Sequence, residues 1–129
     1  MHFGYARVSS DHQDLSLQLD AFARAGIERV YYEKRSGVAH RPQLEKALHD
    51  LVRGDVLIVW KLDRMARSLA DLLGIIERLK YRGASFRSLT EPLDTTTPIG
   101  EFIIQVLGSV AQLERAMIRE RSIAGQRAA

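Results

Sequence analysis

The sequence predicts one three-layer α/β/α domain, with a mainly parallel central sheet of four to five strands and a long C-terminal helix. Strand-like and helical segments alternate along the 129 residues, which is typical of a parallel sheet covered by helices. The unbroken apolar run from Val56 to Trp60 is typical of a strand buried on both faces. No proline interrupts the chain from Pro98 to Ala124, so a single helix of about 27 residues is possible there.

Local signals set the bounds of the expected elements. Gly26 and Gly83 each follow an apolar helical pattern and act as stops, and Pro42 suits the first position of a helix. Ser68 with Asp71 three residues later resembles a capping box. We therefore expect strands at 2–8, 29–33, 56–60 and 84–89, helices at 13–25, from 42 to Gly54, from 68 to Gly83 and at 98–125, and a polar loop at 90–97.

The first half of the long helix is apolar around most of its circumference. One apolar stripe holds Phe102, Val106, Val110 and Leu113, a second holds Ile103, Ile104, Leu107 and Ala111, and a narrow polar seam holds Gln105, Ser109 and Gln112. Such a helix is buried on more than one side, either inside a larger core or between subunits. We favour a subunit interface, because a terminal helix after a complete sheet has no further layer to cover it. The charged second half either contacts a phosphate backbone or is a solvated helical end.

Arginine dominates the basic residues, with fifteen arginines against four lysines and a net charge of +3. The planar guanidinium binds phosphate through two hydrogen bonds, so this bias indicates phosphate recognition, with codon usage as the alternative explanation. The absence of cysteine excludes disulfides and thiolate zinc sites. No apolar stretch reaches the roughly 20 residues of a membrane span, and the N-terminus lacks a signal-peptide pattern, so we expect a cytoplasmic protein without a membrane partner.

Basic and hydroxyl side chains follow the ends of three predicted strands. In open α/β sheets the first and third strands lie side by side, and ligands bind beyond their carboxyl ends. We therefore expect one crevice that contains Arg7, Ser9 and Ser10 after the first strand, Arg41 after the second, and Lys61, Asp63, Arg64 and Arg67 after the third. This concentration of positive charge favours an anion among the side chains, because like charges repel.

These side chains suit phosphoryl transfer. A serine hydroxyl attacks phosphorus once its proton is removed, and arginine or lysine stabilises the charge that develops on the phosphorane oxygens. The four histidines are scattered without the spacing of metal ligands, so we expect neither a metal nor another cofactor. The sequence also lacks a glycine-rich phosphate loop, which argues against nucleotide hydrolysis.

Three strings carry a resemblance to a known family: YARVS at Tyr5 to Ser9, KLDRMAR at Lys61 to Arg67, and ERAMIRER at Glu114 to Arg121. In this order and spacing, with the long terminal helix, they resemble the catalytic domain of the serine site-specific recombinases, the resolvase and DNA invertase family. The similarity covers essentially the whole chain. VWKLDR followed by FRSLTEPLDTTTPIGEF resembles the invertase branch more than the resolvase branch.

The resemblance implies a role for each matching residue. Ser9 matches the nucleophile that attacks a DNA phosphodiester and leaves a 5′-phosphoseryl enzyme and a free 3′-hydroxyl. Asp63 matches an acidic residue that orients an arginine or handles the proton of the leaving group. The arginines that hold the scissile phosphate match Arg7, Arg41, Arg64 and Arg67. Residues that support the site, or that contact DNA or another subunit, match Tyr5, Gln13, Gln18, Lys61, Glu114, Arg115, Glu120 and Arg121.

The resemblance also implies partners and a further domain. Its members act on double-stranded DNA at recombination crossover sites, as homodimers that form tetramers on synapsis, without ATP or metal. Accessory DNA-bending proteins are possible further partners. We expect residues 1–129 to be the catalytic domain, with 98–125 as the oligomerisation and DNA-contacting helix. No helix-turn-helix reader is found before Ala129, so this chain alone is expected to bind DNA weakly and in a salt-dependent way, at the bacterial nucleoid.

Each assignment has an alternative. Ser9 could cap a helix, Asp63 could form a structural ion pair with a neighbouring arginine, and Tyr5 and Gln18 suit structural roles equally well. Trp60 is expected in the core, since it ends a buried strand. For the whole chain, the alternatives are a non-catalytic dimerisation or DNA-binding module of the same fold and a small-molecule phosphotransferase or phosphatase.

Three positions depart from the family pattern. Ser10 stands where threonine is usual and places a second hydroxyl beside Ser9. His40 stands where aspartate is usual, and Ala66 where glycine is usual. None of these changes removes a group with an implied catalytic role.

Overall fold

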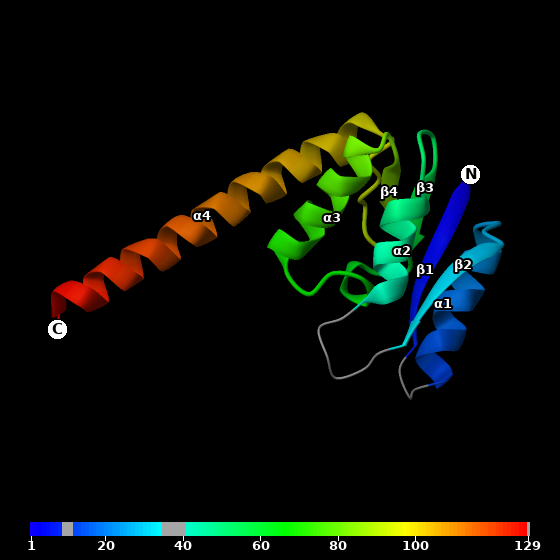
Figure 1. The fold of residues 1–129 in the computed structure, drawn as a ribbon, viewed down its shortest axis with the longest axis horizontal. Helices are drawn as coiled ribbons and strands as arrows, with labels where there is room; N and C mark the ends of the chain where they lie inside the picture. Colours follow the sequence, from blue (N-terminus) through cyan, green and yellow to red (C-terminus); the bar gives the residue numbers. More distant parts are fainter. Residues whose placement is uncertain (9–11, 35–40, 129) are drawn as a thin grey trace.

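The computed structural model describes residues 1–8, 12–34 and 41–128 and contains a four-stranded, fully parallel sheet in the order β2-β1-β3-β4. This order confirms that the first and third strands are neighbours, and the fold class is as predicted (Figure 1). The strands are β1 (His2–Val8), β2 (Arg29–Lys34), β3 (Val56–Val59) and β4 (Ser85–Ser88), and the helices are α1 (His12–Arg24), α2 (Pro42–Asp50), the short 3-10 helix η1 (Leu62–Arg64), α3 (Leu69–Tyr81) and α4 (Pro98–Ala128).

Alternating side chains divide the sheet into two apolar faces. Ala6 and Ile58 pack with Phe22 of α1 on one face, whereas Tyr5 and Leu57 belong to the larger cluster beneath α2 and α3. This alternation follows from the two-residue period of a strand. Gly4 allows α1 to approach β1 closely, because a Cβ at this position would lie 3.2 Å from the Phe22 ring. The sheet is therefore covered on both sides, with α1 on one face and α2 and α3 on the other.

The helix boundaries follow the signals in the sequence. Pro42 is the first residue of α2, and the Ser68 side chain caps α3 by accepting a hydrogen bond from the Asp71 backbone N–H at 3.1 Å. Gly83 follows α3 with a φ of +79°, a conformation that favours glycine. Only half of the expected capping box is observed, however. The Asp71 carboxylate accepts the backbone N–H of Arg67, one residue before the cap, at 2.9 Å, and it also binds the Arg41 guanidinium.

The end of β3 differs from the prediction. The strand ends at Val59, and Trp60 is partly exposed. The Trp60 backbone carbonyl accepts hydrogen bonds from both the backbone N–H and the hydroxyl of Thr90, so it pairs with a loop instead of continuing the strand. The prediction that Trp60 lies in the core was therefore wrong.

The 31-residue helix α4 is about 45 Å long and leaves the body of the domain (Figure 1). Its amino end packs on α3, where Ile103 and Ile104 contact the larger core cluster and Ala111 is buried. Every residue from Gln112 to Gly125 is exposed. No helix in the described part of the chain is long and apolar enough to cross a membrane.

The start of α4 is fixed by a close backbone contact at Gly100. Its N–H donates a hydrogen bond to the Thr97 hydroxyl at 3.0 Å, and that hydroxyl donates to the Asp94 carbonyl at 2.8 Å. A Cβ at Gly100 would overlap the Asp94 carbonyl group, whose carbon would be 2.5 Å away. The contact between α4 and the preceding loop therefore requires glycine at this position.

We predict that Gly100→Ala lowers the free energy of unfolding by about 1–3 kcal/mol, because the added methyl forces α4 away from the loop. Urea denaturation of the chain measures this loss. Gly74→Ala is the matched control, because a Cβ there meets nothing within 4 Å in helix α3. We expect that control to raise stability by about 0.5–1 kcal/mol through helix propensity. Equal effects of the two substitutions would contradict the proposed packing constraint.

Candidate active site

Four arginines gather at the edge of the sheet where the parallel strands end; we call Arg7, Arg41, Arg64 and Arg67 the arginine cluster. Arg7 is the next-to-last residue of β1, and Arg64 is the last residue of η1, which follows β3. Arg41 precedes α2, and Arg67 precedes the Ser68 cap of α3. The carboxyl ends of β1 and β2 and the amino ends of α1 and α2 lie at this same edge (Figure 1).

A hydrogen-bonded chain connects Arg64 to β1. The Arg64 guanidinium donates from Nη2 and Nε to Asp14 Oδ1, at 2.6 and 3.2 Å. Asp14 Oδ2 accepts from the Gln18 side-chain amide at 3.0 Å. The fully buried Gln18 amide in turn pairs with the backbone N–H and carbonyl of Arg7, both at 3.1 Å. Helix α1 therefore joins the ends of β1 and β3.

A second network holds Arg41. Its guanidinium forms two hydrogen bonds with the Asp71 carboxylate, at 2.8 and 2.9 Å, and a third with the Met65 carbonyl at 2.8 Å. The Arg67 backbone N–H also donates to Asp71. The hydrogen bonds from Arg41 outweigh the effect of partial burial and lower the pKa of Asp71, while the same pair raises the pKa of Arg41. Three of the five Arg41 donors are therefore committed to the protein.

Tyr5 forms the buried floor of the cluster. Its hydroxyl donates to Glu33 Oε2 at 3.2 Å, and the same oxygen accepts the Leu44 backbone N–H in the first turn of α2 at 2.9 Å. Burial, together with the nearby Glu33 charge, raises the pKa of Tyr5 far above its ordinary value, so the phenol stays protonated. The charges of Arg7 and Arg41 act in the opposite direction and only partly offset this rise in the pKa of Tyr5.

Two cations lie over the Trp60 ring. The Lys61 ammonium is 4.5 Å from the ring centroid, and the Arg64 guanidinium carbon is 5.5 Å from it. Behind them, Glu91 accepts hydrogen bonds from Ser88, Thr90 and the Leu62 backbone N–H. Burial raises the pKa of Glu91, but these hydrogen bonds and the Lys61 charge outweigh it, so the pKa lies below its ordinary value. Glu91 therefore stays ionised and supports the segment that carries Lys61 and η1.

The anions expected among the arginines are the protein's own carboxylates. Asp14 and Asp71 each pair with a member of the arginine cluster, and neither residue was singled out from the sequence as part of the site. Asp71 stood out only as part of a helix cap, and no pattern in the sequence singled out Asp14. Negative charge is therefore present among the arginines, and it comes from side chains of α1 and α3.

The remaining predicted residues fall into three groups. Asp63 is 71% exposed and accepts a long 3.4 Å hydrogen bond from Arg64, which agrees with the ion-pair alternative and leaves its carboxylate open to solvent. Gln13 is exposed in the first turn of α1. Ser9, Ser10 and His40 lie outside the described residues. The structure does not bring Glu114, Arg115, Glu120 and Arg121 to the arginine cluster.

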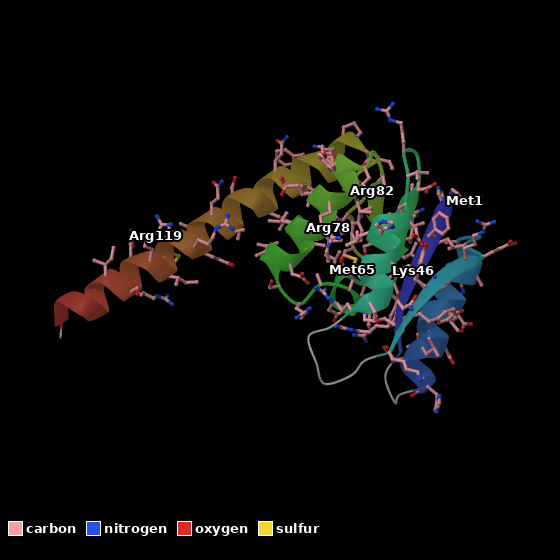
Figure 2. The ribbon with its side chains drawn as sticks, viewed as in Figure 1. Met1, Lys46, Met65, Arg78, Arg82 and Arg119 are labelled. Carbon is pink, nitrogen blue, oxygen red and sulfur yellow. The ribbon has the colours of Figure 1, made fainter. Side chains whose placement is uncertain are left out.

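These last four residues lie on the exposed half of α4. Arg115 lines a hollow between α3 and α4, and Figure 2 shows Arg119 far out on the projecting half of the helix. Within one chain they therefore cannot take part in the same site as Arg7 and Arg64. Among the described residues there is also no group of three acidic or histidine side chains that could hold a metal ion.

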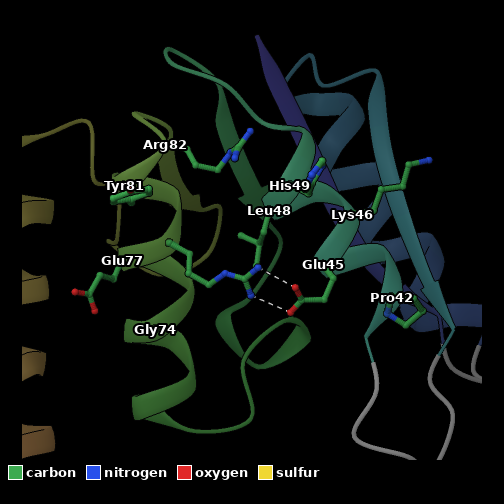
Figure 3. A pocket seen from close by; sticks show the side chains of 10 residues that line it. Pro42, Glu45, Lys46, Leu48, His49, Gly74, Glu77, Tyr81 and Arg82 are labelled. Carbon is green, nitrogen blue, oxygen red and sulfur yellow. Dashed lines mark hydrogen bonds and ion pairs between the residues drawn. The ribbon is translucent and has the colours of Figure 1, made fainter.

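A separate hollow of about 770 Å³ lies between α2 and α3 (Figure 3). The exposed pair Arg78 and Glu45 crosses it through two hydrogen bonds of 2.8 and 2.9 Å. Its wall contains no residue of the arginine cluster and none of the residues predicted for catalysis. This hollow is therefore separate from the arginine cluster at the sheet edge.

We predict that Asp71→Asn lowers the free energy of unfolding by about 1–3 kcal/mol at pH 7, because Arg41 loses a charged partner. The folded-state pKa of Asp71 lies below its ordinary value of 3.8. Its contribution is therefore complete above about pH 4 and is lost as the pH falls through the folded-state pKa. Urea denaturation from pH 7 to pH 2 measures this dependence, with the exposed Asp20→Asn as control. A difference from the parent that stays constant down to pH 2 would contradict the assignment.

The comparisons with known proteins identify the family of this chain. The family model described as "Resolvase, N terminal domain" matches residues 2–129. The chain is 54% identical to the "Probable DNA-invertase y4cG" of Sinorhizobium fredii, covering 98% of this chain and 42% of that protein. It is 48% identical to the DNA-invertase of Escherichia phage P1, covering 100% of this chain and 70% of that relative. The resemblance to the invertase branch is thereby confirmed.

The solved structures agree with the fold. The N-terminal catalytic domain of TP901-1 integrase superposes with a TM-score of 0.76 at 23% identity, covering 90% of this chain and 97% of that structure. At this identity the likeness supports the fold alone, and the family rests on the sequence matches. The chain belongs to the resolvase and DNA-invertase family of serine recombinases, on the invertase side, and corresponds to the recombinase catalytic domain.

Proposed function

We propose that this chain cuts and rejoins double-stranded DNA at recombination crossover sites, with Ser9 as the nucleophile. The observation that carries the proposal is the arginine cluster: Arg7 comes two residues before Ser9, and ion pairs hold the guanidinium groups of Arg41 and Arg64. Guanidinium groups fixed before substrate arrives stabilise a phosphorane without further reorganisation. We infer that the substrate is DNA because the relatives are named as DNA invertases.

The proposed reaction is a transesterification. The Ser9 hydroxyl loses its proton and its oxygen bonds to phosphorus, while the bond from phosphorus to the 3′ oxygen breaks and that oxygen takes a proton. The products are a 5′-phosphoseryl enzyme and a free 3′-hydroxyl. The number of phosphoester bonds is unchanged, so the reverse attack by a 3′-hydroxyl rejoins the strand without ATP. Arg7, Arg64 and Arg67 offset the negative charge that develops on the phosphorane oxygens, and the exposed Asp63 handles the proton of the leaving group.

We assign the exposed stripe of α4 to contact with a second copy of the chain. Phe102 and Leu113 are 64% and 60% exposed, and Val106 and Val110 lie between them on the same stripe. The opposite stripe already packs on α3, so this half of the helix has an apolar face that no described part of the chain covers. A symmetric dimer buries such a face against its own copy. A tetramer on synapsis, and DNA contact by the charged half of α4, extend this proposal.

Sequence-specific binding is assigned to a domain outside residues 1–129. The phage relative is longer than this chain, which spans 70% of it. A catalytic domain that contacts mainly phosphates binds DNA in a strongly salt-dependent way and without sequence preference. Because the proposed substrate is DNA, we assign the place of action to the nucleoid in the cytoplasm. DNA-bending proteins would be available there as accessory partners.

We predict that Ser9→Ala abolishes a covalent link between protein and the 5′ end of the cut strand, whereas Ser10→Ala retains it. The assay fuses this chain to a DNA-reading domain of known specificity, supplies DNA with two matching sites and is quenched with denaturant. An adduct that survives Ser9→Ala would reject the nucleophile. Turnover of soluble phosphate esters without any adduct would instead support a small-molecule phosphotransferase, and bound DNA without an adduct in any variant would support a non-catalytic module.

We predict that Val110→Asp weakens self-association at least tenfold, because a charge on the exposed stripe would be buried without a partner. Sedimentation equilibrium measures the dimer dissociation constant. Ala23→Asp adds the same charge to an exposed position of α1 and serves as the control. A parent chain that stays monomeric at every concentration, or a control that dissociates equally, would reject the α4 interface.

A further inference from the structure

The two edges of the Arg64 guanidinium have different surroundings. The Nε and Nη2 edge donates twice to one oxygen of Asp14, at 3.2 and 2.6 Å. The Nη1 side meets only the exposed Asp63, at 3.4 Å, among the described residues. Arg64 and Asp14 are both mostly buried, with side chains 28% and 17% exposed. One edge of the guanidinium is therefore held by Asp14, while the other edge contacts only a carboxylate that is itself exposed, among the described residues.

We propose that Asp14 is a positioning residue, which sets the direction in which Arg64 presents its second edge to the scissile phosphate. This inference rests on the proposed function and names a residue that neither the sequence motifs nor the resemblance assigned. Asp14 does not contact the phosphate in this arrangement. It acts through Arg64, because a guanidinium gripped along one edge has a defined plane.

The second oxygen of Asp14 links the orientation of Arg64 to strand β1. It accepts the Gln18 amide, which pairs with both backbone groups of Arg7. The position of Arg64 is thus tied to the backbone of β1, two residues before Ser9. An error of about 1 Å in such an alignment can cost on the order of a hundredfold in rate. Asp14 therefore couples the arginine from the β3 side to the strand that leads to the nucleophile.

Trp60 supports Arg64 from another direction. The guanidinium carbon lies 5.5 Å from the centroid of its ring. Trp60 is also the only tryptophan in the chain. Its fluorescence therefore reports on the surroundings of Arg64 without an added label.

Two other roles for Asp14 make different predictions. As a carboxylate in the first turn of α1, it also interacts favourably with the helix dipole, a role that does not involve Arg64. As a competing anion, it would instead mask Arg64 and weaken phosphate binding. Removal of its charge would then strengthen phosphate binding, whereas loss of a positioning residue weakens it. The direction of the change separates positioning from masking.

The first experiment titrates inorganic phosphate into the DNA-free chain and follows Trp60 emission. We expect a saturable change in the parent, and a requirement for about tenfold more phosphate in Asp14→Asn. Asp20→Asn, an exposed carboxylate on the same helix, is the matched control and should behave as the parent. Tighter phosphate binding by Asp14→Asn, or binding equal to that of the parent, would overturn the proposal. This experiment does not require cleavage, so it decides the role of Asp14 even if the proposed reaction fails.

The second experiment measures the rate of adduct formation in the fusion described above. We expect Asp14→Asn to slow it by about tenfold to a hundredfold, with DNA affinity changed less than twofold. In an Arg64→Gln background the same substitution should add less than a twofold effect, because the residue through which Asp14 acts is gone. Independent, multiplying losses would indicate a helix-stabilising role and overturn the proposal. A parent that forms no Ser9-dependent adduct would reject the proposed function instead.

Discussion

The structure depends on how four guanidinium groups are held together at one edge of a parallel sheet. Two unit charges 5 Å apart repel by about 3 kcal/mol at an effective dielectric constant of about 20, so the arginine cluster needs compensating negative charge. Asp14 and Asp71 supply it, each through two hydrogen bonds to one arginine. Both carboxylates come from the first turns of helices, where the helix dipole also favours negative charge. The amino ends of α1 and α3 thereby hold Arg64 and Arg41 in place.

Buried polar side chains extend this support into the core. Gln18 and Glu33 are almost fully buried, and each joins two segments, Gln18 linking α1 to β1 and Glu33 linking Tyr5 to the start of α2. No buried side-chain nitrogen or oxygen in the described ranges lacks a hydrogen-bond partner. Satisfied networks of this kind favour one arrangement, because any displacement leaves a polar group unpaired in a dry interior. The edge of the sheet is therefore built before any phosphate arrives.

Helix α4 differs from the polar sheet edge because it exposes an apolar surface. Its amino half packs on α3 and keeps an exposed apolar stripe, and every residue from Gln112 to Gly125 is exposed. The sheet edge where β1 and β2 end and the carboxyl end of α4 are widely separated in one chain (Figure 1). The proposed strand exchange requires both properties, namely a rigid site in each subunit and a surface on which subunits assemble.

The sequence by itself determined the fold class, the order of elements and the edge at which the arginines meet. Strand runs, helix stops and the first-to-third strand rule depend on local periodicity and chain topology, and both are encoded in short segments such as Val56–Val59 and around Gly83. Helix capping at Ser68 was predictable for the same reason. The family resemblance added the identity of Ser9 as the expected nucleophile.

Only the tertiary structure decided which groups pair across segments. Asp14 and Arg64 are 50 residues apart, and Arg41 and Asp71 are 30 apart, so no local pattern indicates either pair. The position of Trp60 was also not predictable from local sequence. Its carbonyl pairs with Thr90, and its ring contacts the Lys61 and Arg64 cations. Local periodicity specifies which face of an element is apolar. The partner of a particular charge is set by the packing of elements distant in sequence, and this packing gives the arginine cluster its geometry.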